Sequence, residues 1–387
     1  MIPFLSRGFR PFFLGASLFA ILAMAVWLAV YRFGLALDFT GVSPAQWHAH
    51  EMIFGYSMAV IAGFLLTAAW NWTGQETASG GALAMLFAAW AAARALLLPG
   101  SGLLWYAAAA DLAFMFGLVM AVARPILIAR QGRQAPVLLI GTLLAAANLS
   151  FYLGAAGWFP RGVHLGIHGG FYLVLGMVLF MGSRVIPFFT ERGVGYEVKL
   201  KQSRWTDLAM AALYPAYVLS ELLLPRHALG AVLAAALLAL NSLRVSGWHT
   251  LGIWQKPLLW GLFAAFLMIN LGFLFRALAL VTAVPDFLAL HAYAVGGVGM
   301  VTVSMMARVT LGHTGRNVHA SPPVVTLLLL GMVLAAMIRI FPPLVDAAHH
   351  ALWITLSGLA WIATFSLFLI VFFPMLVRPR ADAGQPY

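Results

Sequence analysis

Apolar stretches of about 20 residues recur along the whole chain, and they constrain its fold more than any other feature. Such a stretch forms a helix long enough to cross a bilayer core of about 30 Å. Only helices and closed barrels satisfy their backbone groups within lipid, so the expected fold class is an all-α polytopic membrane protein with about 12 transmembrane helices. The expected spans are 12–31, 47–70, 80–98, 102–123, 136–157, 164–190, 205–224, 227–244, 257–281, 286–311, 321–341 and 351–376.

The composition supports a single integral membrane domain over residues 1–387. The chain is 63% hydrophobic and 9% charged, whereas soluble domains carry about 25% charged residues. The absence of cysteine excludes disulfides, iron–sulfur clusters, thiolate copper sites and covalent c-type haem attachment. Any bound metal must therefore be held by histidine, methionine, carboxylate or backbone oxygen.

The basic residues predict how the chain is oriented. We interpret the net charge of +11 as a sign of membrane topology, with no nucleic-acid partner. The first apolar run is too long for a signal-peptide core of about 7–15 residues, so we expect a retained helix. Placing both termini in the cytoplasm puts sixteen Lys and Arg residues inside and six outside: Arg32, Arg94, Arg161, Arg226, Arg276 and Arg339. This distribution follows the positive-inside rule.

The stretch 47–55 (WHAHEMIFG) places polar groups at the start of an apolar span. His48, His50 and Glu51 are costly in lipid unless they pair with each other, a metal or water. His164 and His168 lie at the start of the sixth expected span, and His291 lies at the start of the tenth. All five histidines are expected near the outer membrane face.

The helix starts at His50, His168 and His291, which we call the histidine entrances, indicate a threefold repeat. His50 and His291 each precede a Thr-Gly pair by 23 residues, at Thr73 and Thr314, and His168 precedes Thr190 by 22. The histidines recur four expected spans apart, which predicts repeats 1–124, 125–244 and 245–380 with helices 2, 6 and 10 central. The alternative is a chance likeness among apolar helices. In architecture, though not in ligand motifs, three arcs of four helices resemble the haem–copper oxidase superfamily.

Local motifs resemble a closer family, the NnrS proteins. The resemblance covers nearly the whole chain, at 7–13 (RGFRPFF), 48–55 (HAHEMIFG), 62–67 (AGFLLT), 71–74 (NWTG), 184–190 (RVIPFFT) and 307–316 (ARVTLGHTGR). It implies a bacterial inner-membrane protein that contains haem and copper and is associated with denitrification and nitric oxide stress. It does not assign individual ligands.

The histidines are the candidate metal ligands: His48, His50, His164, His168 and His291. His164 and His168 share one helix face, so both can bind one ion, or one can support the other. His48 and His50 diverge by about 200° on a continuous helix and therefore suit different sites, whereas in a segment that is not helical both can reach a single ion. His48, His50, His168 and His291 are also the candidate haem ligands. We expect His164 and His168 to be ligands, because Gly166, Gly169 and Gly170 leave room beside them for a flat cofactor. The alternative is that these side chains are hydrogen-bonded interfacial histidines.

The charged residues near the outer face have several possible roles. Glu51 is the candidate catalytic proton donor, or else a solvated interfacial carboxylate. Haem propionates require nearby cations, for which the candidates are Arg94, Arg161, Arg276 and Arg339. Asp111 lies deep in the fourth expected span, where it either belongs to a proton path or pairs with Arg94.

Three functions fit these features. The first is a haem b and copper (or second iron) protein that binds and reduces or detoxifies nitric oxide, with electrons from quinol or a separate cytochrome. The second is a proton-coupled or copper-related transporter. The third is a non-catalytic protein that binds nitric oxide or protects a metal site, or a purely structural partner.

Overall fold

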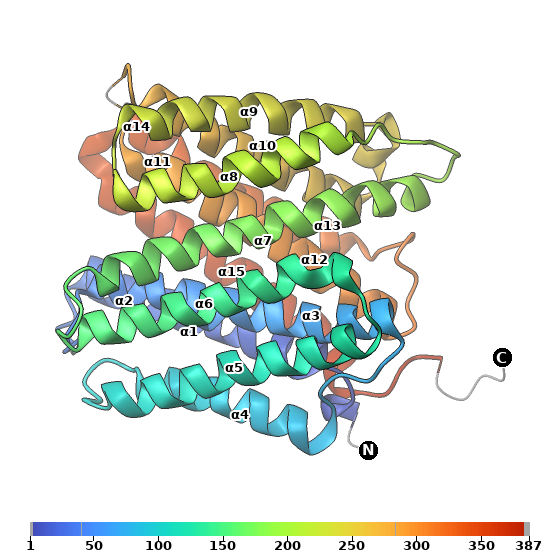
Figure 1. The fold of residues 1–387 in the computed structure, drawn as a ribbon, viewed down its shortest axis with the longest axis horizontal. Helices are drawn as coiled ribbons and strands as arrows, with labels where there is room; N and C mark the ends of the chain where they lie inside the picture. The colour runs from blue at the N-terminus through green and yellow to red at the C-terminus, as the bar shows by residue number, and fades with distance from the viewer. Residues whose placement is uncertain (1–2, 40, 283, 383–387) are drawn as a thin grey trace. The chain divides into compact units, whose positions relative to one another are not determined.

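The computed structural model describes residues 3–39, 41–282 and 284–382, and it contains no strand within those ranges (Figure 1). The α-helices are α1 (Phe9–Phe33), α2 (Pro44–His50), α3 (Met58–Thr73), α4 (Gly80–Leu96), α5 (Leu104–Ile128), α6 (Ala135–Ala155), α7 (Gly162–Gly193), α8 (Arg204–Leu223), α9 (Ala228–Trp248), α10 (Pro257–Leu278), α11 (Asp286–His291), α12 (Met300–His313), α13 (Pro323–Ile340), α14 (Pro342–Val345) and α15 (His350–Val377). Two π-helices, η2 (Glu51–Ser57) and η5 (Ala292–Gly299), continue α2 and α11. Short 3₁₀ turns occur at Pro3–Leu5, Gly132–Gln134, Leu251–Gln255 and Ala347–His349.

Each of the twelve expected spans is helical, which confirms the predicted fold class. Within the described residues, ten helical segments are long and apolar enough to cross a membrane. The other two are α4, which has only 17 residues, and α8, whose Asp207 and Glu221 lower its mean hydropathy. The chain is therefore a multi-pass membrane protein.

The chain divides into two compact units. Unit 1 contains the described residues of 1–174, 306–316 and 365–387, and unit 2 contains those of 175–305 and 317–364. The division runs through α7, α12 and α15, because each of these helices contributes residues to both units. The three expected repeats stay a prediction.

Unit 1 is built from antiparallel helix pairs that pack closely through small residues. Helix α1 packs against α3, and α5 packs against both α4 and α6 (Figure 1). A Cβ atom added at Gly63 would lie 2.6 Å from the Phe13 ring and 3.2 Å from the Phe9 backbone. Glycine at this position therefore permits α1 and α3 to approach closely, as is common between membrane helices.

In unit 2, glycines likewise permit close helix packing around the π-helix η5. Helices α8, α9 and α10 pack in sequence, and α10 also contacts η5. A Cβ atom at Gly297 would lie 2.6 Å from Ile269, and one at Gly296 would lie 2.7 Å from Met268. The glycines of the tenth expected span are therefore packing positions against α10.

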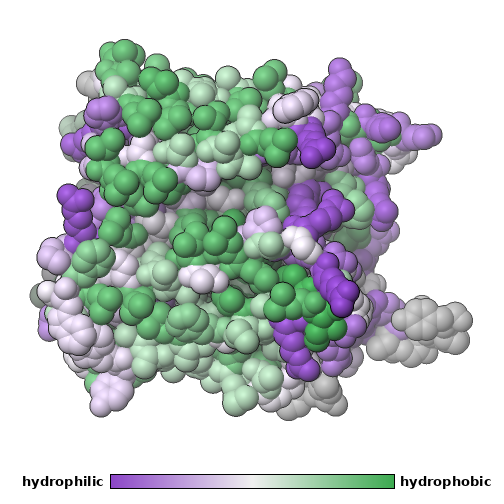
Figure 2. Space-filling model, in the orientation of Figure 1, coloured by the Kyte–Doolittle hydropathy of each residue, from purple (hydrophilic) through white to green (hydrophobic). Residues whose placement is uncertain are grey.

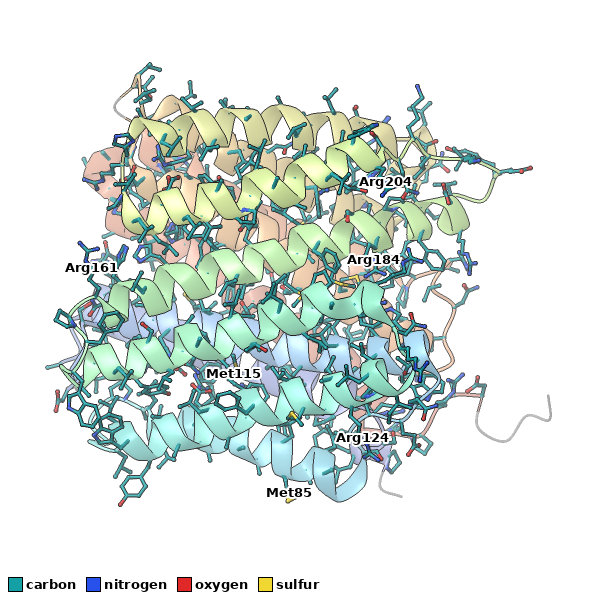
Figure 3. All side chains as sticks on the ribbon, in the orientation of Figure 1. Met85, Met115, Arg124, Arg161, Arg184 and Arg204 are labelled. Carbon is teal, nitrogen blue, oxygen red and sulfur yellow. The ribbon has the colours of Figure 1, made fainter. Side chains whose placement is uncertain are left out.

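The outer surfaces match a lipid environment. Large hydrophobic side chains are exposed along α9, including Leu229, Val232 and Leu243, and Figure 2 shows hydrophobic residues along the middle of this helix with hydrophilic residues beyond its ends. In unit 1, Arg124 and Arg161 lie toward opposite ends of the helices, as their assignment to opposite membrane sides requires (Figure 3). In unit 2, Arg184 and Arg204 lie toward the same end (Figure 3).

Arg10 ties the two ends of the described chain together within unit 1. Its side chain is 3% exposed, and Nη1 donates to the carbonyl oxygens of Leu376 (2.9 Å), Arg378 (2.6 Å) and Met375 (3.3 Å). The last carbonyls of a helix lack partners within it, so Arg10 caps the C-terminus of α15.

We predict that Arg10→Met lowers the free energy of unfolding by about 2 kcal/mol, since buried carbonyls lose a charged donor. Thermal unfolding of the full chain in detergent measures this loss. Arg380→Met is the matched control, because Arg380 is exposed and pairs locally with Asp382, and surface pairs contribute little. Equal melting temperatures for the two variants would contradict this role.

Candidate functional site

Four charged or titratable side chains form a buried cluster in unit 1: His50, Glu51, Arg94 and Asp111. Arg94 bridges the carboxylates, with Nη1 2.5 Å from Glu51 Oε1 and Nη2 2.5 Å from Asp111 Oδ2. The three side chains are only 5%, 1% and 0% exposed. Of the two interpretations of Asp111, the structure supports a pair with Arg94 and adds Glu51 to it.

His50 is fully buried against this pair. Its Nδ1 lies 2.8 Å from Glu51 Oε1, and its Nε2 lies 2.9 Å from Asn148 Oδ1. When the ring is protonated it donates from both nitrogens, and the cluster then holds two positive and two negative charges. Because both nitrogens already have partners, binding a metal through His50 requires one hydrogen bond to break.

Two neighbours of the cluster were missed by the sequence analysis. The Tyr152 hydroxyl donates to Asp111 Oδ2 at 3.0 Å, and Asn148 Oδ1 accepts from His50 Nε2 at 2.9 Å. Both lie on α6 and are 0% exposed. A polar residue such as Asn148 inside an apolar span was the available signal, since such residues are costly in lipid without a partner.

The cluster is not fully saturated with hydrogen bonds. Asp111 Oδ1, Arg94 Nε and Asn148 Nδ2 are buried and make no hydrogen bond within the described residues. Unsatisfied buried polar atoms are unusual and often mark a bound water or a functional group. The site therefore has both proton-carrying groups and spare hydrogen-bonding capacity in an apolar surrounding.

Each π-helix begins directly after a predicted ligand. His50 precedes η2, and His291 precedes η5. The α-helices that follow are both succeeded by a glycine with positive φ, Gly74 at 66° and Gly315 at 76°. The two entrances thus share local geometry as well as residue spacing, and π-helices occur frequently at functional sites.

His164 and His168 lie side by side on one face of α7, as their spacing predicted. Their ring centroids are 4.3 Å apart, and His168 Nδ1 donates to the carbonyl of His164 at 3.1 Å. This bond leaves the lone pair of the neutral ring on Nε2, the nitrogen that binds metals in such arrangements.

The glycines beside these histidines have a different role from the one expected. A Cβ atom at Gly166 would lie 2.6 Å from Phe151, and one at Gly170 would lie 2.5 Å from Phe54. They allow α7 to approach α6 and η2. The expectation that they leave room for a flat cofactor was wrong, because aromatic side chains occupy that space.

His291 repeats the arrangement of His168 in unit 2. Its Nδ1 donates to the carbonyl of Phe287 at 2.7 Å, so the lone pair of the neutral ring is again on Nε2. His48 lies apart from the charge cluster, stacked on Trp27 with centroids 4.7 Å apart. His48 and His50 do face different surroundings, as their two-residue spacing predicted.

The four candidate arginines occupy different environments. Arg94 is committed to the cluster. Arg276 bonds Glu221 at 2.8 Å and the His227 carbonyl at 3.2 Å, and Arg339 lies 5.1 Å from the Phe287 ring centroid. Only Arg161 is exposed. A haem propionate at Arg94 or Arg276 would have to compete with a carboxylate already present.

The described residues contain no group of three or more His, Asp or Glu side chains arranged to hold a metal ion. Cofactor ligation therefore remains a prediction, for which single imidazoles such as His168 and His291 have the suitable tautomer.

Comparison with models of protein families matches residues 3–380 to the model described as NnrS protein. Comparison with curated proteins finds no match. The family match spans nearly the whole chain, including the histidine entrances, the buried charge cluster and both π-helices. The chain belongs to the NnrS family.

Proposed function

We propose that the chain is a membrane metalloprotein that binds haem b together with copper or a second iron, and that binds and reduces or detoxifies nitric oxide. Its family fits a membrane protein linked to the nitric oxide response. The proposed location is the bacterial inner membrane, with both termini in the cytoplasm. Nitric oxide is small, neutral and lipid-soluble, so it can reach a site within the bilayer.

The observation that carries this proposal is the shared tautomer of His168 and His291. In each residue, Nδ1 donates to the carbonyl oxygen four residues earlier. This hydrogen bond fixes the orientation of the ring and leaves the lone pair of the neutral imidazole on Nε2. Metal-binding histidines commonly hold their second nitrogen in this way. His164 stacks beside His168 and is the candidate support or second ligand, and imidazole suits both iron and copper.

Haem, when bound, would supply the redox and diatomic-binding chemistry. Reduction of two nitric oxide molecules to nitrous oxide and water consumes two electrons and two protons. The absence of cysteine excludes an attached c-type haem, so electrons would come from quinol or a separate cytochrome. Glu51 is the candidate proton donor, because it is bound to His50 inside an apolar region.

A second candidate function, a proton-coupled or copper-related transporter, is favoured by the buried cluster itself. Ionisable groups inside membrane proteins often mark ion or proton paths. A transporter would lack a Soret band when purified and would move a solute or copper across liposome membranes. A haem protein would show the band without such flux, so one purified sample distinguishes the two.

We predict that His168→Ala and His291→Ala each reduce haem or metal content several-fold while the protein still inserts. The optical spectrum and elemental analysis of purified protein measure this content. His319→Ala is the control, because His319 is exposed. Full cofactor content in both variants would refute these residues as ligands.

We also predict that Arg94→Met lowers the free energy of unfolding by about 3–5 kcal/mol, because two buried carboxylates lose their shared cation. Adding Asp111→Asn should restore part of this loss, since one uncompensated charge is removed. Arg226→Met, which breaks an exposed pair with Asp286, should change stability little. Thermal unfolding distinguishes the three, and additive losses for Arg94→Met and Asp111→Asn would contradict the bridge.

A further inference from the structure

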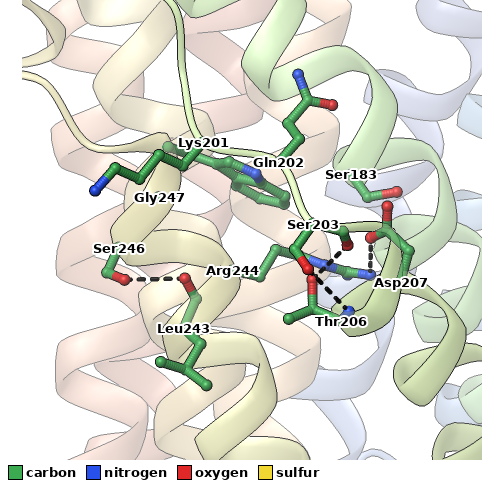
Figure 4. A pocket seen from close by; sticks show the side chains of 11 residues that line it. Ser183, Lys201, Gln202, Ser203, Thr206, Asp207, Leu243, Arg244, Ser246 and Gly247 are labelled. Atoms are coloured by element: carbon green, nitrogen blue, oxygen red, sulfur yellow. Dashed lines mark hydrogen bonds and ion pairs between the residues drawn. The ribbon is translucent and has the colours of Figure 1, made fainter.

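A polar pocket of about 400 Å³ lies in unit 2, where α7, α8 and α9 meet the segment before α8 (Figure 4). It is lined by Ser183 of α7, by Ser203, Thr206 and Asp207 at the start of α8, and by Arg244 of α9. None of these residues belongs to the histidine entrances or to the buried charge cluster. The pocket therefore has a chemistry of its own.

Arg244 is the residue that points to a ligand. Its side chain is 7% exposed and forms one ion pair, from Nη2 to Asp207 Oδ1 at 2.8 Å. Nε and Nη1 are buried and make no hydrogen bond within the described residues. Donors left unpaired in this way are costly. Nη1 lies beside Nη2 at the outer edge of the guanidinium, where an oxygen of an anion can accept from it.

The first turn of α8 adds further donors. Ser203 caps the helix by accepting the Thr206 N–H at 3.5 Å, which leaves the Ser203 hydroxyl hydrogen available. The first N–H groups of this 20-residue helix have no partner within it, and its dipole favours an anion there. Figure 4 shows Ser203, Thr206 and Asp207 facing the Arg244 guanidinium, whereas the Lys201 ammonium extends away from it.

The charges in the pocket favour a ligand with low negative charge. Arg244 contributes one positive charge, part of which Asp207 neutralises, and Asp207 is 52% exposed. The Lys201 ammonium extends away from this pair and adds a positive charge only at the margin of the pocket. This charge balance matches a phosphodiester or a singly charged phosphate. A phosphate oxygen would accept from Arg244 Nη1 while Nη2 keeps Asp207.

We propose that this pocket binds a phosphate-bearing anion. Trp205, on the first turn of α8, is 82% exposed, as tryptophans at a membrane surface commonly are. Basic pockets between helices at that level suit phospholipid headgroups. A soluble phosphate compound has the same recognition chemistry, so the experiment separates the two sources. The proposal does not depend on the haem function.

The test uses the full purified chain and two probes. In one arm, the chain is placed in nanodiscs of phosphatidylcholine with or without phosphatidylglycerol. In the other, inorganic phosphate is titrated into the phosphatidylcholine nanodiscs. A ligand that binds only the folded state raises the melting temperature with its concentration, so we expect such a rise in at least one arm. Tryptophan fluorescence reports unfolding.

Thr206→Glu is the decisive variant. It puts a negative charge into the pocket but completes a Ser-x-x-Glu capping box with Ser203, so α8 should remain stable. We expect it to weaken the probe's affinity about tenfold or more, because like charges repel. Asp207→Asn should strengthen the affinity, since it removes the competing carboxylate from Arg244.

Arg226→Ala is the matched control for net charge, because Arg226 is exposed and pairs with Asp286 away from the pocket. A response that this variant retains and Thr206→Glu loses supports the proposal. A phosphatidylglycerol response alone identifies the lipid as the source, and a phosphate response alone identifies a soluble ligand. No response in either arm, or an equal response in Thr206→Glu, would overturn it.

Discussion

The arrangement of unit 1 depends on one guanidinium held between two carboxylates in an apolar interior. Arg94, Glu51 and Asp111 come from α4, η2 and α5, so their ion pairs fix three elements relative to one another. Removing any one charge would leave another without compensation where water is scarce. The pairing extends through His50 to Asn148 on α6, and the polar network therefore also connects α6 to these elements.

The imidazole of His50 is held differently from those of His168 and His291. His50 uses both nitrogens within the network, whereas His168 and His291 each donate from Nδ1 to a carbonyl of their own helix. The first arrangement holds charge and protons in place, and the second prepares a ring to donate a lone pair. The haem or copper site that we propose at His168 and His291 would therefore not compete with the hydrogen bonds of His50.

Much of the fold followed from residue patterns, because lipid imposes simple rules. The apolar windows located all twelve helices, and the i, i+4 spacing of His164 and His168 placed their rings on one face. Side-chain partners were harder to predict. Nothing in the spacing of Glu51, Arg94 and Asp111 indicated that one arginine pairs with both acids, and nothing near Tyr152 in the sequence indicated that its hydroxyl bonds to Asp111. The prediction for Gly166 failed because a glycine can make room either for a cofactor or for a neighbouring helix. The sequence does not show that Phe151 fills the space beside it.

The two π-helices coincide with a difference in residue spacing among the three histidine entrances. From His50 to Thr73 and from His291 to Thr314 there are 23 residues, but from His168 to Thr190 there are 22, and α7 contains no π turn. One extra residue in a regular α-helix would rotate every following side chain by about 100° about the helix axis. The wider turn of a π-helix accommodates the extra residue without this rotation. Deleting one amino acid from η2 or η5 should therefore remove the π-helix while the helices on either side keep the same faces toward their neighbours. The one-residue difference in spacing therefore coincides with the presence of a π-helix after His50 and His291 and its absence after His168.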